Sequence, residues 1–226
     1  MKKISKILAA NRSEIAIRIF RAAEESGIKT AAIYSKEDRF AIHRFKTDES
    51  YLVGEGKGPI QAYLDIDSII RIAKDAKVDA IHPGYGFLSE SPELADQCEK
   101  NNITFIGPSK EILKRFGNKT EAKKVAQEAN VKTVPSVLVT KVNTKSIQKD
   151  VDKIGYPVIV KASWGGGGRG MRVVHASKDL LDQIETAQSE SLKAFGKDDV
   201  FIEKFLEDAA HIEVQILGDK HGNIIH

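Results

Sequence analysis

The sequence predicts an α/β protein with two modules, a parallel β-sheet covered by helices and then a smaller α+β module. Short apolar runs alternate with helical patterns up to residue 106, which is typical of a parallel sheet. The character changes around residues 107–118, and extended segments dominate from there on. A chain of 226 residues, 41% of them hydrophobic, is long enough to bury a substantial core.

The first module is predicted to begin with the apolar strand Ile4–Ala10. Apolar residues at positions 15, 19, 22 and 23 then recur at helical spacing. Asn11, with Glu14 three residues later, predicts the N-terminal cap of this helix, and Gly27 predicts its end. Further elements are expected as strands at Thr30–Tyr34, Asp79–His82 and Ile103–Ile106 and as helices at Asp65–Ala76 and Pro92–Asn101.

Two polar turns are expected at the carboxyl ends of strands, where open parallel sheets bind ligands. They are Asn11–Glu14, after the first strand, and His82–Glu90, after a later one. The second carries Tyr85, Phe87 and Leu88. An aromatic loop at this place fits a binding rim and fits equally well a tight turn that packs against the second module.

The second module is predicted to open with a helix at Thr120–Asn130, where Asn118 and Glu121 resemble a capping box. A long helix is expected at Ser177–Phe195. Extended segments are expected at Thr133–Thr140, Val158–Ala162, Met171–His175, Val200–Phe205 and His211–Leu217, the last forming a hairpin with Ile224–His226.

Composition excludes several classes of protein. A net charge of +3, from 35 basic and 32 acidic residues, gives no support for a nucleic-acid partner. The single cysteine, Cys98, cannot form an internal disulfide or a zinc site, and we expect it to be a small buried or half-buried residue and not a nucleophile. No run approaches the ~20 apolar residues of a membrane span, and the first apolar run is too short for a signal peptide. We therefore expect a cytoplasmic protein with no membrane partner.

The tract Lys161–Met171 contains four consecutive glycines between two β-like segments. Such a run is costly to order, and its use is to bring backbone N–H groups close to an anion. Lys161 and Arg169 flank the glycines, and Trp164 and Met171 offer apolar surface near a base. A flexible linker is the alternative, but it explains neither the charges nor the flanking strands. The tract fits neither the dinucleotide fingerprint nor the P-loop.

Two lysines are candidates for contact with an anion. Lys161 ends an apolar strand beside the glycines, although taken alone it could equally be a snorkelling strand-end lysine. Lys119 falls in the first turn of a predicted helix, where a cation opposes the helix dipole. A bound anion would offset that penalty, but by itself a solvated lysine is the better explanation of Lys119.

Glu203–Leu206 follows a short predicted strand, and its extended backbone can hydrogen-bond an adenine edge while Phe205 and Leu206 pack. His211 and Glu213 are two residues apart on the next predicted strand, so they share a face. His211 could reach a ribose hydroxyl from there. An ordinary hairpin with a mixed face is an alternative that spacing does not exclude.

Six segments together resemble the biotin carboxylase component of biotin-dependent carboxylases, which belong to the ATP-grasp superfamily. They occur in the family's order and spacing from Lys6 to His226, essentially the whole chain: KILAANRSEIAIRIFRAA, AIHPGYGFLSE, FIGPS, GYPVIVKASWGGGGRGMRVV, VFIEKFL and HIEVQILGDKHGN. Residues 33–66 and the tryptophan of KASWGGGG are most similar to one branch of the family, the pyruvate carboxylases.

The resemblance implies four parts. They are a Rossmann-like (pre-ATP-grasp) domain at 1–116, a connecting helix at 117–131, an ATP-grasp lid at 132–203 and the start of a truncated C-terminal ATP-grasp sheet at 204–226. It implies ATP, Mg²⁺ and bicarbonate as ligands, biotin on a carrier domain as the acceptor, transfer of the carboxyl group to pyruvate to give oxaloacetate, and a homo-oligomer at full length.

The resemblance also implies roles for individual residues. Those that match the family's nucleotide site are Lys119, Lys161, Gly167, Gly168, Met171, Glu203, Lys204, Phe205, Leu206 and His211. Tyr85 and Gly86 match the loop that faces biotin.

One departure bears on activity. The family's magnesium-binding glutamates, bicarbonate-binding basic residues and catalytic arginine match positions beyond His226, and no acidic pair here replaces them. We therefore expect no catalytic or metal-binding residue in this polypeptide and no activity from it alone, which normal bicarbonate-dependent ATPase turnover would contradict.

Alternatives remain open at this point. One is the biotin carboxylase subunit of an acetyl-CoA or another acyl-CoA carboxylase. Others are a different ATP-grasp ligase, such as a carbamoyl-phosphate or peptide-bond-forming enzyme, and a non-catalytic nucleotide-binding module. A nicotinamide dehydrogenase is disfavoured, because no glycine fingerprint follows the first strand.

Overall fold

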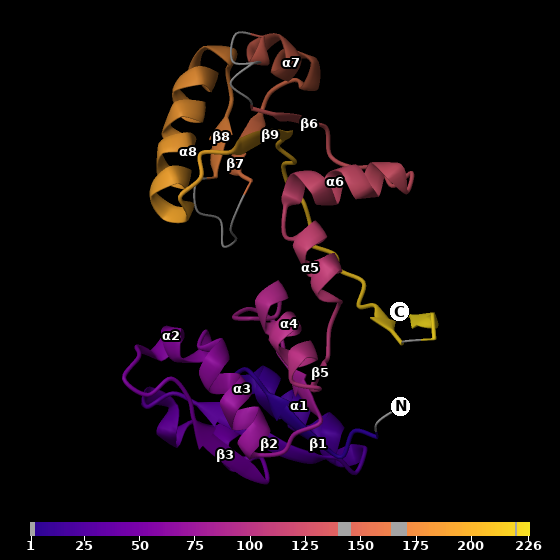
Figure 1. The fold of residues 1–226 in the computed structure, drawn as a ribbon. Helices are drawn as coiled ribbons and strands as arrows, with labels where there is room; N and C mark the ends of the chain where they lie inside the picture. The colour runs from indigo at the N-terminus through magenta and orange to yellow at the C-terminus, as the bar shows by residue number, and fades with distance from the viewer. Residues whose placement is uncertain (1–2, 140–145, 164–170, 220) are drawn as a thin grey trace. The chain divides into compact units, whose positions relative to one another are not determined.

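The computed structural model describes residues 3–139, 146–163, 171–219 and 221–226. The chain separates into two compact units, the first ending at Ala122 and the second beginning at Lys123 (Figure 1). The first unit is coloured indigo to magenta in Figure 1, and the second continues to yellow.

The first unit is built on a five-stranded parallel sheet, which confirms the predicted fold class. Its strand order is β3-β2-β1-β4-β5. The strands are β1 (Lys6–Ala9), β2 (Lys29–Tyr34), β3 (Glu49–Leu52), β4 (Ala80–His82) and β5 (Thr104–Phe105). The helices of this unit are α1 (Ser13–Glu25), α2 (Pro59–Tyr63), α3 (Ile66–Asp75), α4 (Pro92–Lys100) and α5 (Lys110–Phe116), with 3₁₀ turns η1 (Glu37–Phe40) and η2 (Ile42–Phe45).

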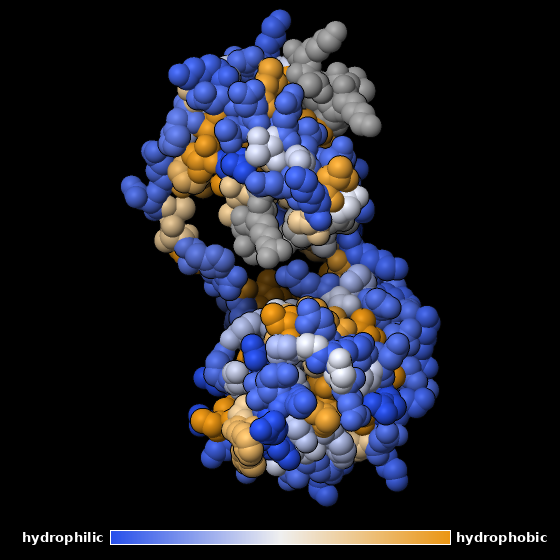
Figure 2. All heavy atoms as spheres, turned by 90° about the vertical axis from the view of Figure 1, so that its left-hand side faces the viewer, coloured by the Kyte–Doolittle hydropathy of each residue, from blue (hydrophilic) through white to orange (hydrophobic). Residues whose placement is uncertain are grey.

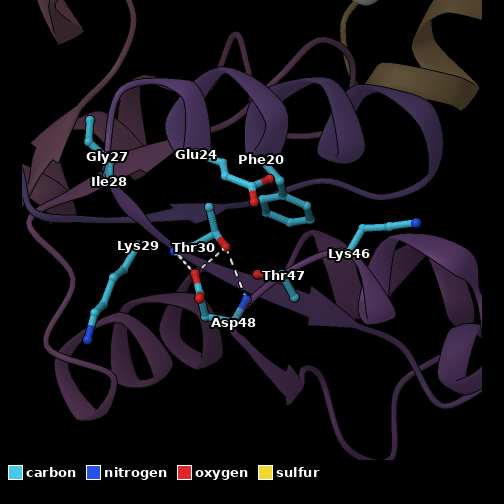
Figure 3. A pocket seen from close by; sticks show the side chains of 9 residues that line it. All are labelled: Phe20, Glu24, Gly27, Ile28, Lys29, Thr30, Lys46, Thr47 and Asp48. Carbon is cyan, nitrogen blue, oxygen red and sulfur yellow. Dashed lines mark hydrogen bonds between the residues drawn. The ribbon is translucent and has the colours of Figure 1, made fainter.

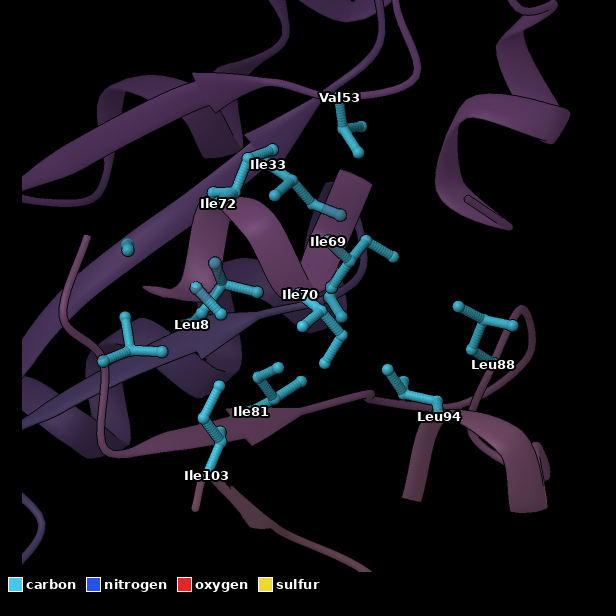
Figure 4. Close-up of a cluster of buried hydrophobic side chains, with 14 of the residues drawn as sticks. Leu8, Ile33, Val53, Ile69, Ile70, Ile72, Ile81, Leu88, Leu94 and Ile103 are labelled. Carbon is cyan, nitrogen blue, oxygen red and sulfur yellow. The ribbon is translucent and has the colours of Figure 1, made fainter. Parts of the chain in front are cut away.

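Helices cover both faces of this sheet, because alternate residues of each strand enter different cores. Leu8 and Ile81 pack with α3 and α4 in one core, which Figure 4 shows. Ile7 and Ala80 pack with α1 in the other. Cys98 is fully buried in the first of these cores, as predicted, and burial raises its pKa to about 12.

A pocket of about 530 Å³ lies at the amino-terminal ends of β2 and β3 (Figure 3). The Asp48 carboxylate there accepts hydrogen bonds from the backbone N–H of Thr30 (2.8 Å) and from its hydroxyl (2.7 Å). Those bonds hold the pKa of Asp48 below its usual range. This arrangement joins two strands at their amino-terminal ends, whereas parallel sheets bind ligands beyond the carboxyl ends of their strands. We therefore assign it a structural role.

The second unit contains a four-stranded antiparallel sheet in the order β6-β9-β7-β8. The strands are β6 (Ser136–Leu138), β7 (Val158–Ala162), β8 (Arg172–Val174) and β9 (Val200–Lys204). Helices α7 (Ile147–Ile154) and α8 (Leu180–Phe195) share one core with this sheet. A 3₁₀ turn, η3 (Ser177–Asp179), precedes α8, and α6 (Lys119–Glu128) begins in the first unit and ends in the second. The α+β character of this module is as predicted.

The end of the chain differs from the prediction. The expected strand His211–Leu217 is wrong, because only β10 (Leu217–Gly218) forms and it pairs antiparallel with β11 (Ile224–Ile225). Ile212, Val214 and Ile216 are exposed, so burial does not hold this segment in an extended form. The hairpin itself is confirmed, with Leu217 opposite Ile225.

The surface of both units is mainly hydrophilic on the face shown in Figure 2, with hydrophobic side chains in patches between the polar ones. Within the described part of the chain, every helix is too short or too polar to cross a membrane.

Candidate functional site

In the first unit, β1 and β4 are neighbours, and Ala9 lies opposite His82. The chain runs from β1 outward to β2 and β3 on one side and then returns to β4 on the other. Ligands of open α/β sheets bind at such a switch in direction, beyond the carboxyl ends of the strands. The structure therefore brings the two predicted polar turns to the place where such a sheet binds its ligand.

Asn11 joins these two turns. Its side-chain amide donates to the carbonyls of Pro83 (2.7 Å) and Tyr85 (2.8 Å), and its Oδ1 accepts from the N–H of Arg12 (2.8 Å). The side chain is buried. The prediction that Asn11 caps the following helix is wrong, since α1 begins after Arg12 without a side-chain cap. The amide N–H groups hold the loop carbonyls, and Oδ1, the atom that a cap would use, accepts from the N–H of Arg12 instead.

The loop His82–Glu90 presents Tyr85 at the surface. The Tyr85 ring is 61% exposed, and its hydroxyl donates to the carboxylate of Glu14, which raises the pKa of Tyr85. Gly86 has φ +66° and open space around it. At the start of the loop, Nδ1 of His82 accepts from the N–H of Gly84 (3.0 Å), and burial lowers the pKa of His82. The accepting Nδ1 carries no proton in this contact.

Behind the loop, Phe87 stacks on Tyr63 with ring centroids 5.1 Å apart. The guanidinium of Arg12 lies 5.7 Å from the Tyr63 centroid and pairs with Asp38 at 3.1 Å. The Tyr63 hydroxyl donates to the same carboxylate at 2.7 Å. Burial by itself raises the pKa of Asp38, but the bonds from Tyr63 and Arg12 hold that pKa below its ordinary value. Tyr63, Arg12 and Asp38 thus hold Phe87 in place and support the loop His82–Glu90.

The second unit holds most of the predicted nucleotide residues. Lys161, on β7, donates to Oε2 of Glu203, on the neighbouring β9, at 2.5 Å. Oε1 of the same carboxylate pairs with Lys123, on α6. Burial raises the pKa of Glu203, but the bonds from Lys123 and Lys161 outweigh it and keep the pKa low. Two ammonium groups around one carboxylate leave a net positive charge, which suits a phosphate.

Sequence reasoning missed Lys123. It is one of three lysines in α6, with Lys119 and Lys124, and no local pattern separates it from the others. A hydrogen bond from Lys123 to the carbonyl of Val134 (3.2 Å) and a position 5.5 Å from the Phe201 centroid fix its ammonium in place. The signal lies in contacts distant along the chain, so the sequence pattern does not carry it.

The end of β9 presents backbone acceptors. The N–H groups of Lys204 and Phe205 donate to the carbonyls of Pro135 (3.0 Å) and Pro157 (3.1 Å). Two residues paired in this way in an antiparallel sheet normally exchange two N–H···O bonds. Because proline has no N–H, Pro135 cannot donate to the carbonyl of Lys204, and Pro157 cannot donate to that of Phe205. The carbonyls of Lys204 and Phe205 therefore suit an outside donor such as the amino group of adenine. The Lys204 side chain instead donates to the carbonyls of Gly155 (3.2 Å) and Tyr156 (2.9 Å).

The other predicted nucleotide residues are placed less decisively. Met171 and Leu206 are about half exposed. His211 pairs with Glu213 at 2.8 Å, but on a segment that is not a strand. Lys119 is the first residue of α6, and the predicted cap is confirmed because Asn118 Oδ1 accepts from two N–H groups of the first turn. Gly167 and Gly168 lie outside the described residues.

Among the residues that the structure describes, no group of three or more His, Cys, Asp or Glu side chains could hold a metal ion. The chemistry that the second unit offers is binding of an anion and of a base edge, and the first unit presents the aromatic loop His82–Glu90 at the carboxyl ends of its strands.

Comparison with known proteins matches this division of the chain. The family model "Biotin carboxylase, N-terminal domain" matches residues 3–113, and "Carbamoyl-phosphate synthase L chain, ATP binding domain" matches residues 118–226. Pyruvate carboxylase of Bacillus subtilis is 52% identical over 225 residues. That match covers 100% of this chain and 20% of the relative, so the chain spans about a fifth of its length.

Solved structures agree. The biotin carboxylase–β-γ-ATP complex from Campylobacter jejuni has a TM-score of 0.91 at 44% identity, over 99% of this chain and 50% of that one. The biotin carboxylase domain of Hydrogenobacter thermophilus 2-oxoglutarate carboxylase, a dimer in complex with MgADP and bicarbonate, has a TM-score of 0.90 at 42% identity, over 100% of this chain and 49% of that one. The chain therefore consists of a biotin carboxylase N-terminal domain followed by an ATP-binding domain, and it matches the N-terminal biotin carboxylase region of pyruvate carboxylases.

Proposed function

We propose that the chain binds ATP through its second unit and supplies this site to the biotin carboxylase reaction of a pyruvate carboxylase. The carrying observation is the carboxylate of Glu203 held between Lys161 and Lys123, next to the strand end that offers the Lys204 and Phe205 carbonyls. This arrangement combines cations for phosphates with acceptors for an amino group, and an adenine nucleotide presents both.

In the proposed reaction, bicarbonate oxygen attacks the γ-phosphorus of ATP and ADP leaves. The carboxyphosphate so formed breaks into carbon dioxide and phosphate. Biotin on a carrier domain would supply N1′ as the acceptor of the carbon dioxide, and the released phosphate would take the proton of N1′. The carboxyl group is then passed to pyruvate, giving oxaloacetate. Biotin supplies a carboxyl carrier, and the protein must stabilise charge and exclude water from a labile intermediate.

We assign the residues of this chain to that scheme as follows. Lys119, Lys161, Gly167 and Gly168 contact the phosphates, Glu203–Leu206 with Met171 hold the base, and His211 faces the ribose. Tyr85 and Gly86 face biotin from a loop that Asn11 holds through the carbonyls of Pro83 and Tyr85. Mg²⁺ belongs to the scheme because phosphoryl transfer requires it, but we derive no step through it, since the described residues offer no cluster that fits it.

The wider context is proposed in the same way. We divide the chain into the domain at 1–116, the connecting helix at 117–131, the lid at 132–203 and the start of the last sheet at 204–226. A homo-oligomer and a cytoplasmic location complete the proposal. The dimer named for the Hydrogenobacter relative supports the first.

Calorimetric titration of the 226-residue chain with ATP tests the nucleotide site. We expect saturable binding, and we expect Lys161→Met to weaken it about tenfold, the loss of one charge-assisted contact. Lys153→Met, on the exposed face of α7, is the matched control and should bind like the unsubstituted chain. No binding by the unsubstituted chain, or equal losses in both variants, would reject the assignment.

The acceptor is tested on the full-length protein. Carboxylation of pyruvate, without carboxylation of acetyl-CoA, is the expected result. The reverse preference would favour an acyl-CoA carboxylase. Biotin-independent ATP cleavage would instead point to a different ATP-grasp ligase.

A further inference from the structure

Glu203 is shared by two lysines that are held very differently. Glu203 is 8% exposed, and its carboxylate gives one oxygen to each ammonium. Lys123 also donates to the carbonyl of Val134 (3.2 Å) and lies 5.5 Å from the Phe201 ring centroid. Within the described residues, Lys161 is tied to Glu203 alone. Lys123 is therefore held in place by several contacts, whereas Lys161 needs to give up only its hydrogen bond to Glu203 in order to bind another group.

This difference matters when an anion arrives. When the Lys161 ammonium exchanges its bond to Glu203 for one to a phosphate, the carboxylate loses that partner, and a buried carboxylate without a partner costs several kcal/mol. Lys123 removes that cost, because it remains on the other oxygen of the carboxylate. Without Lys123, the carboxylate would retain Lys161 as its only cation and compete with the phosphate for it.

We propose that Lys123 is a positioning residue for nucleotide binding: it neutralises Glu203 permanently, and so releases Lys161 to the phosphate. The inference rests on the proposed ATP site and deepens it. Lys123 itself touches no nucleotide in this account. Its whole effect passes through the charge of Glu203, which is the property that an experiment can isolate.

A double-mutant cycle measured by ATP calorimetry on the 226-residue chain tests this. Lys123→Met is expected to weaken ATP binding about tenfold when Glu203 is present. In the Glu203→Gln background, where no carboxylate competes for Lys161, the same substitution should change binding less than about twofold. Lys124→Met, the exposed neighbour on α6, is the control and should leave binding unchanged in both backgrounds.

A merely structural role for Lys123 would give the same loss in both backgrounds, and that result overturns the inference, as does a Lys123→Met variant that binds ATP normally. Circular dichroism and thermal unfolding confirm that each variant is folded. If the unsubstituted chain binds no ATP, the proposed function fails and takes this inference with it. Binding by the unsubstituted chain with an additive cycle rejects the inference alone.

Discussion

The side-chain amide of Asn11 donates a 2.7 Å hydrogen bond to the carbonyl of Pro83 and thereby ties the turn after β1 to the loop after β4. The second N–H of the same amide goes to Tyr85 at 2.8 Å. One buried side chain thus defines the path of a loop more than seventy residues away along the chain, at the switch point of the sheet.

Replacing Asn11 by alanine should destabilise the first unit by about 2 kcal/mol or more, because two buried carbonyls lose their donor. Urea unfolding followed by circular dichroism measures the change. Asn101→Ala removes one local bond at the end of α4 and is expected to cost less than about 1 kcal/mol. Equal costs for the two substitutions would show that Asn11 does not hold the loop.

Gly84 and Gly86 allow a matched test of the same loop. Both have positive φ, +67° and +66°, so alanine at either pays the left-handed penalty of about 1 kcal/mol. A Cβ at Gly84 would also lie 2.8 Å from the Asn11 side-chain nitrogen, whereas a Cβ at Gly86 meets nothing within 4 Å. Gly84→Ala should therefore be the more damaging by a further 1–3 kcal/mol or so in the free energy of unfolding. A larger loss for Gly86→Ala would contradict this packing.

Acid should weaken the network around Asp38. Its pKa is lower in the folded state than in the unfolded chain, so its contribution is complete above the unfolded value of about 3.9 and is lost as the pH falls through the folded value. The difference in unfolding free energy between the unsubstituted chain and Asp38→Asn should thus be largest above about pH 5 and shrink toward pH 2.

Tyr63→Phe checks the cause of that pH dependence. It removes one hydrogen bond to the Asp38 carboxylate, so the folded pKa of Asp38 rises and the acid loss begins at higher pH. A pH profile unchanged by this substitution would mean that Tyr63 does not stabilise the charged form.

Pro135 is expected to matter for recognition of the base. Alanine at this position restores an N–H opposite the Lys204 carbonyl, so the ladder can close and compete with an adenine amino group. Pro135→Ala should weaken ATP binding about tenfold while leaving the stability nearly unchanged.

Inosine triphosphate, which lacks that amino group, separates this effect from a general loss of affinity. Pro135→Ala should change the affinity for inosine triphosphate little, so the ratio of the affinity for ATP to that for inosine triphosphate should fall. Pro108→Ala, in the first unit, is the control. A parallel loss for both nucleotides would show that the Lys204 carbonyl does not read the base.

The longer elements of the fold were predictable because each carries its own periodic pattern. The strands at residues 30–34 and 158–162 and the long helix after residue 177 lie close to their predicted bounds. The short elements β3, α2, α5 and α7 were missed. Each owes its form to packing against a sheet already in place, and a few residues alone are too short to show a period.

The same distinction between local sequence patterns and tertiary packing applies to the residues of the candidate site. By itself, the sequence determined that polar turns follow β1 and β4, that Lys161 and Glu203 lie on strands of one module, and that a glycine tract lies beside Lys161, because strand ends and turns are recorded in local residue order. Only the tertiary structure decided that β1 and β4 are neighbours, that Asn11 serves the loop rather than the helix, and that Lys123 is the lysine of α6 that meets Glu203. Those choices depend on contacts between residues 70 to 80 positions apart, which the folded chain creates and no local pattern encodes.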